Sequence, residues 1–141
     1  MKLFAILSLL FVTTFSFSQN THTWLPEQLL ATQDLAIKIK LNSKDKPLIF
    51  NVGPMENIKG AVSVGNGNAV TFSHKMETEL SMESKTKPIV IYCGCCSYSN
   101  CPNIKPAYDA LQKMGFKNTK VLELPENLKT DWVSKGYPMD K

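Results

Sequence analysis

The four cysteines of the chain lie together in one short segment, between Cys93 and Cys101. Cysteines that form structural disulfides usually close long loops, because long closures constrain the unfolded chain most. Bridges inside this segment would close loops of a few residues and would stabilise the fold little. We therefore interpret the segment as a site of thiol chemistry, with candidate reactive residues Cys93, Cys96 and Cys101.

The residues on either side of the cysteines predict how they are positioned. Residues 89–92 (Ile-Val-Ile-Tyr) are consecutive β-formers without alternation, which is typical of a strand covered on both faces. A helix is predicted to begin near Pro102 and to end before Gly115. Its unpaired N–H groups and its dipole would then face the loop and favour an anion. We expect the sulfur of Cys93 to be exposed and ionised where these amides converge.

The remaining pattern predicts an α/β domain. Short strands are expected over residues 48–52, 61–64 and 121–124, and helices over residues 72–82 and 128–134. A helix is also expected from Pro26 to about residue 35, whereas residues 37–41 alternate with lysines as in a strand. This order predicts a central, mainly parallel sheet of about five strands with helices on both faces. Ligands bind at the carboxyl ends of such strands, where the cysteine loop lies.

Composition sets limits on the function. The chain has 141 residues, 43% hydrophobic and 20% charged, as in a single globular domain. All 16 basic residues are lysines, scattered among the acidic residues, so no basic stripe for nucleic acid exists. We expect a monomer without nucleic-acid partners.

The N-terminal residues have the pattern of a secretory signal. Lys2 precedes an apolar stretch, and the small residues Ser16 and Ser18 stand before Gln19. The stretch is shorter than a transmembrane helix needs to be. We expect residues 1–18 to be a signal peptide and residues 19–141 to form the exported domain. The destination would be the periplasm or the medium, without membrane attachment after cleavage.

Several segments resemble the rhodanese-like domain. The strand 89–92 followed by Cys93 is similar to that family's strand and nucleophilic cysteine, and residues 132–138 match its closing W-x-x-x-G-Y-P. Residues 111–117 are similar to its helix end with a Gly-Phe pair, and residues 58–61 weakly resemble its H-I-P-G-A segment. The C-G-C-C block resembles an exported, cysteine-rich subgroup of the family.

The resemblance implies sulfur transfer without a cofactor or a bound metal. The Cys93 thiolate would take sulfur from a small donor, hold it as a persulfide and pass it to a thiol acceptor. Cys96 or Cys101 could attack the persulfide, releasing sulfide and leaving a disulfide. The family's loop usually carries an arginine, and this chain has none. The residues implied to surround the substrate are Gly94, Cys95, Ser97, Tyr98, Ser99 and Asn100.

Three other functions remain open on the sequence alone. Cys93 and Cys96 form a C-x-x-C pair, a spacing used in thiol–disulfide exchange. Thiolates also suit zinc or cuprous ion, although all four sulfurs would then have to converge from one short loop. The histidines, His22 and His74, lie far from that loop in sequence. Finally, the domain could bind a partner without any chemistry.

Overall fold

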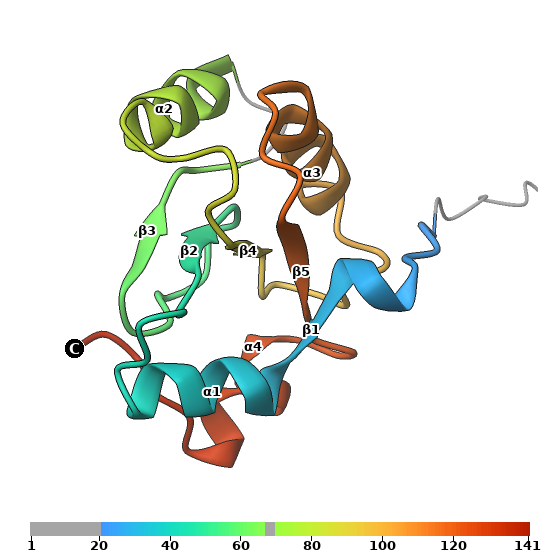
Figure 1. Ribbon diagram of the computed structural model, residues 1–141. Helices are drawn as coiled ribbons and strands as arrows, with labels where there is room; N and C mark the ends of the chain where they lie inside the picture. Colours follow the sequence, from blue (N-terminus) through green and yellow to red (C-terminus); the bar gives the residue numbers. More distant parts are fainter. Residues whose placement is uncertain (1–20, 67–69) are drawn as a thin grey trace, which may run out of the picture.

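The computed structural model describes residues 21–66 and 70–141 of the chain (Figure 1). The expected signal peptide, residues 1–18, lies outside this part, and so do residues 19 and 20, the start of the domain that we expect to be exported. Within the described ranges, no helix is long and apolar enough to cross a membrane.

A parallel sheet forms the centre of the molecule. The described residues contribute five strands in the order β1-β5-β4-β2-β3, and every neighbouring pair is parallel. All residues of the central strand β4 are buried, as its uninterrupted run of β-formers predicts. The predicted sheet is therefore confirmed. The strands are β1 (Leu29–Ala31), β2 (Leu48–Asn51), β3 (Ala61–Ser63), β4 (Ile89–Tyr92) and β5 (Thr119–Glu123).

Helices cover both faces of this sheet, as predicted (Figure 1). The residues of β4 alternate between two cores: Ile89 and Ile91 pack with α2 and α3, whereas Val90 and Tyr92 pack with α1 and α4. This alternation follows from the two-residue period of a strand. The helices are α1 (Thr32–Lys40), α2 (Val70–Leu80), α3 (Ile104–Lys113) and α4 (Leu128–Asp131), and the short turn η2 (Val133–Lys135) follows α4.

The N-terminal region differs from the prediction. The helix expected from Pro26 to about residue 35 is instead a 3₁₀ turn, η1 (Pro26–Gln28), followed by strand β1 and helix α1. The strand forms because the backbone of Leu29 pairs with Val121 of β5, a contact that no local pattern encodes. The apparent alternation of residues 37–41 is part of α1, whose buried residues are Thr32, Leu35, Ala36 and Ile39.

The C-terminal segment packs on the face of the sheet that carries α1 and α4. The side chain of Trp132 is fully buried, and its Nε1 donates a hydrogen bond to the carbonyl of Pro138 over 3.0 Å. Its ring packs edge to face on Tyr137, with centroids 5.1 Å apart. Met139 then forms an isolated antiparallel bridge with Ile58. The motif at residues 132–138 therefore has a packing role on the face of the sheet that carries α1 and α4.

One methionine within α2 and one just beyond its end give a matched test of the core on the face of the sheet that carries α2 and α3. Met76 is fully buried, whereas Met82 lies just beyond the helix and is 94% exposed. We expect Met76→Ala to lower the free energy of unfolding by about 2–5 kcal/mol, because it leaves a cavity in the core. Met82→Ala should change it by no more than about 0.5 kcal/mol. Urea denaturation of both variants measures this, and equal losses would contradict the packing described.

Candidate functional site

Cys93 is positioned by the end of strand β4. The carbonyl of Tyr92 accepts a hydrogen bond from the amide of Val52 over 2.8 Å, which extends the pairing with β2. The hydroxyl of Tyr92 is held on the other face, where it accepts from the amide of Ile58 and donates to the carbonyl of Glu56. Because side chains alternate along a strand, Cys93 points to the face covered by α2 and α3.

Gly94 turns the chain out of the sheet. Its φ is +81°, a left-handed conformation that favours glycine. A Cβ at this position would also lie 2.9 Å from Cβ of Leu128. The carbonyl of Gly94 accepts a hydrogen bond from the amide of Leu128, the first residue of α4, over 2.9 Å. The start of the loop is therefore fixed against α4.

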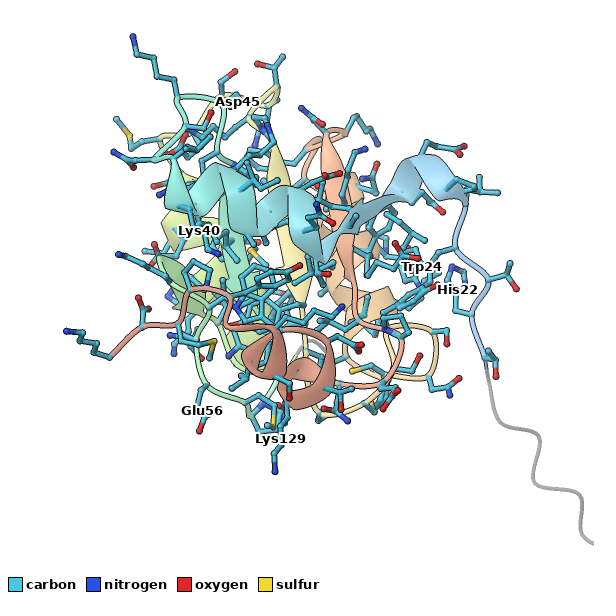
Figure 2. All side chains as sticks on the ribbon, turned by 90° about the horizontal axis from the view of Figure 1, so that it is seen from below. His22, Trp24, Lys40, Asp45, Glu56 and Lys129 are labelled. Carbon is cyan, nitrogen blue, oxygen red and sulfur yellow. The ribbon has the colours of Figure 1, made fainter. Side chains whose placement is uncertain are left out.

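The rest of the loop is tied to two distant segments. The amide of Tyr98 donates to the carbonyl of Leu124, just after β5, over 3.0 Å. The amide of His22 donates to the carbonyl of Ser99 over 2.9 Å. His22 and Trp24 lie together where the N-terminal segment meets the domain (Figure 2), with ring centroids 4.4 Å apart. These bonds define the loop's path without any disulfide.

The loop brings the cysteine sulfurs together in a chain of contacts. The Sγ of Cys93 lies 3.3 Å from that of Cys95, which lies 3.3 Å from that of Cys96. The sulfurs of Cys93, Cys95 and Cys101 all lie within 4.8 Å of one another. Cys93 and Cys101 are buried, Cys96 is half-buried and Cys95 is exposed. The sulfurs grouped with that of Cys93 are thus those of Cys95 and Cys101, and not that of its C-x-x-C partner Cys96.

Hydrogen bonds to its sulfur favour ionisation of the Cys93 thiol. The Cys101 thiol is the main donor to its sulfur, and it lowers the pKa of Cys93 to about 5 together with the Cys95 thiol, the Cys95 backbone N–H and the Asn103 amide. The Asn103 Nδ2 lies 3.6 Å from the Cys93 sulfur. Burial acts in the opposite direction and is outweighed. The hydrogen bonds to its sulfur therefore favour the thiolate form of Cys93.

The neighbouring thiols are held in their neutral form. Burial, followed by hydrogen bonding to Cys93, raises the pKa of Cys95 to about 12. The hydrogen bond that Cys101 donates to Cys93 is the main cause that raises the pKa of Cys101, and burial adds to it. The backbone N–H of Asn103, next to the start of α3, opposes this rise, because its hydrogen bond to the Cys101 sulfur lowers the pKa of Cys101. A single thiolate with neutral thiol donors is a charge arrangement suited to a nucleophile.

The expectation that the Cys93 sulfur is exposed is wrong. Cys93 has 0% exposure, because the loop and the end of β2 close over it. Gly53, just after β2, packs so tightly that a Cβ there would lie 2.4 Å from the Cys93 sulfur and 2.5 Å from its carbonyl oxygen. The sulfur is nevertheless surrounded by donors from Cys95, Cys101 and Asn103, and not by hydrocarbon alone. Of the cysteines in the loop, Cys95 is exposed and Cys96 is half-buried.

The remaining loop residues predicted to surround the substrate make contacts of their own. The hydroxyls of Ser97 and Ser99 hydrogen-bond to each other over 2.9 Å, and Tyr98 packs against the core. A surface depression of about 840 Å³ opens beside Cys101 instead of Cys93. It is lined by Thr21, His22, Ser99, Asn100, Cys101, Pro102, Lys105 and Pro106.

Sequence reasoning missed two residues that shape this site, Gly53 and Asn103. Gly53 follows β2, the strand predicted by residues 48–52, and a glycine at the end of a neighbouring strand signals a close approach of backbone. Asn103 precedes the first residue of α3, a position where asparagine is common and its amide can turn toward the loop. The signal at Gly53 can be interpreted only when the strand order is known, because that order places β2 beside β4.

Comparisons with known proteins define the fold. No protein-family model and no curated protein matches the sequence. Among solved structures, the BH2092 protein of Bacillus halodurans is similar with a TM-score of 0.59 and 20% identity, over 81% of this chain and 77% of that chain. A rhodanese-like domain from an Anabaena protein is similar with a TM-score of 0.55 and 18% identity, over 80% and 78%. The class defined by the sheet and these similarities is an α/β domain. Its particular fold is the rhodanese-like fold, as the sequence motifs predict.

The charge state of Cys93 gives the first prediction for this site. We expect the ultraviolet absorbance of thiolate in the reduced protein to show one thiol that ionises at a pKa of about 5 and is protonated as the pH falls through that value. Cys93→Ser should abolish this step, and Cys96→Ser should leave it in place. A reduced protein whose first thiol ionises near the ordinary pKa of about 8.5 would contradict the description.

The contact of Gly53 with Cys93 gives the second prediction. We expect Gly53→Ala to push Cys93 away from its donors, because the new methyl group would overlap its sulfur and carbonyl oxygen. The free energy of unfolding should fall by about 1–3 kcal/mol, as for other overpacked sites. The pKa of Cys93 should rise in the same absorbance titration. A variant with the stability and the thiol titration of the parent would show that Gly53 does not position Cys93.

Proposed function

We propose that the protein is a sulfurtransferase that carries sulfur as a persulfide on Cys93 and passes it to a thiol acceptor. The observation that carries this proposal is the thiolate at the end of the central strand, on which donors from Cys95, Cys101 and Asn103 converge. The rhodanese-like fold, which the solved structures share, supports a domain of the sulfurtransferase type.

The proposed reaction has two balanced steps. In the first, the Cys93 thiolate attacks the outer sulfur of a donor persulfide, the S–S bond of the donor breaks, and the donor leaves as a thiolate. In the second, an acceptor thiolate attacks the outer sulfur of the Cys93 persulfide, and Cys93 leaves as a thiolate. There is no net oxidation. The donors that lower the pKa of Cys93 assist the second step, because a thiol of lower pKa is the better leaving group.

The absence of arginine favours a small persulfide as the donor. Bidentate recognition of a doubly charged donor such as thiosulfate uses a planar guanidinium group, and lysine offers only a point charge. All basic residues of this chain are lysines. A persulfide of a small thiol carries less charge and needs no such clamp. We therefore propose that class of donor.

The side chain of Cys95 controls access in this proposal. Cys93 has no exposed surface, and the exposed Cys95 contacts its sulfur. We propose that this side chain is the part of the cover over Cys93 that moves aside to admit the donor, because it is exposed and contacts the Cys93 sulfur. A small side chain at position 95 should therefore make persulfide formation faster, although it removes one donor to Cys93.

The proposal is tested by treating the reduced protein with a small persulfide and measuring the intact mass. We expect one added sulfur on the parent chain and none on Cys93→Ser, since the nucleophile is lost. Cys96→Ser is the matched control, because its sulfur contacts Cys95 and not Cys93, and it should still take up sulfur. Cys95→Ala should do so several-fold faster than the parent. Added sulfur on the Cys93→Ser protein would end the proposal.

A further inference from the structure

The sulfurs of Cys93, Cys95 and Cys101 form a group whose geometry suits a metal ion. Each pair of these sulfurs lies within 4.8 Å, although the residues come from one short loop. A metal site built from thiolates requires its sulfurs to lie this close together. We propose that these three cysteines bind a single monovalent copper ion in a three-coordinate, all-sulfur site. The inference is independent of the proposed sulfur transfer.

The spacing of the sulfurs is close to that of a three-coordinate thiolate site. Metal–thiolate bonds are about 2.3 Å long, so three sulfurs placed evenly around one ion lie about 4 Å apart. Here the sulfurs of Cys93 and Cys95 are 3.3 Å apart. No two sulfurs among Cys93, Cys95 and Cys101, which we call the triad, are more than 4.8 Å apart. Changes of less than about 1 Å in these sulfur–sulfur distances would complete the geometry.

The number and the type of ligands favour copper(I) over zinc. Thiolates are soft ligands that suit copper(I), zinc and iron–sulfur clusters. Structural zinc is almost always four-coordinate. In the part of the chain that the structure describes, the group of ligand atoms this close contains only the three sulfurs, without a histidine or a carboxylate. The sulfur of Cys96 lies 3.3 Å from that of Cys95 and is not part of this group. A three-coordinate, all-sulfur site is therefore one for copper(I).

The residues around the triad have the features expected around a metal site. Two of its three residues, Cys93 and Cys101, are buried, so water has little access to the ion. The exposed Cys95 provides a route by which an ion can enter. The Asn103 amide, 3.6 Å from the Cys93 sulfur, would orient that ligand from outside the triad. Gly53 leaves no space for Cys93 to swing away toward β2.

The test uses the reduced protein under anaerobic conditions, without any sulfur donor. Copper(I) is titrated against a chromophoric copper(I) chelator, and X-ray absorption reports the ligands of the bound metal. We expect one copper ion per chain with three sulfur ligands and no nitrogen or oxygen ligand. A four-sulfur shell, several copper ions per chain, or stronger retention of zinc than of copper(I) in the same competition would overturn the proposal.

The cysteine variants separate this site from general thiol affinity. We expect Cys95→Ser to weaken copper(I) binding by at least about 100-fold, more than the 10- to 100-fold typical of residues that only support a ligand. Cys95 is exposed, so this variant should fold, and circular dichroism checks that it does. Cys96→Ser should bind copper(I) as the parent does, because Cys96 is outside the triad. Equal affinities of these two variants would overturn the proposal, whatever the outcome of the sulfur-transfer assay.

Discussion

The pairing of β4 between β2 and β5 is the constraint on which the rest of the site depends. It buries the central strand on both faces, and its two-residue period decides that Tyr92 and Cys93 point to opposite sides of the sheet. Tyr92 is anchored among Glu56 and Ile58, so the register cannot slip without breaking these hydrogen bonds. Cys93 thus enters the core that faces α2 and α3, and the chain must turn at Gly94 to leave the sheet.

A thiolate buried at that point requires hydrogen-bond donors, and the clustering of cysteines supplies them. Burial alone would keep the Cys93 thiol neutral, but the thiol of Cys101, the thiol and backbone N–H of Cys95, and the Asn103 amide act against it. The effect on the neighbours is the reverse, because a thiol that donates to a thiolate resists losing its own proton. The cysteines therefore solvate one another. This arrangement suits a leaving group as it stands, whereas the proposed metal site would in addition displace the protons of Cys95 and Cys101. Both proposed uses occupy the Cys93 sulfur, so they exclude each other.

The features that the sequence predicts well are those with local causes. Strand β4 occupies the predicted residues 89–92, because uninterrupted β-formers have few alternatives, and the helix after the loop ends before Gly115, whose φ of +91° suits glycine. Strand β1 could not be foreseen, because it exists only through its pairing with β5. The features of the site also divide into those with local causes and those that depend on distant residues. The loop and its cysteines follow from spacing, whereas the burial of Cys93 follows from Gly53 on the neighbouring strand β2.

The division between a buried, ionised sulfur and an exposed, neutral one has a consequence for reactivity. Cys93 is the better nucleophile but is inaccessible. Cys95 is exposed, but its pKa is raised to about 12, so its thiol stays protonated at neutral pH. Oxidants react with thiolates that are exposed, so neither sulfur is readily oxidised in the closed arrangement. Any reaction at this site therefore requires the Cys93 sulfur to become accessible, and a lowered pKa alone does not make that sulfur reactive.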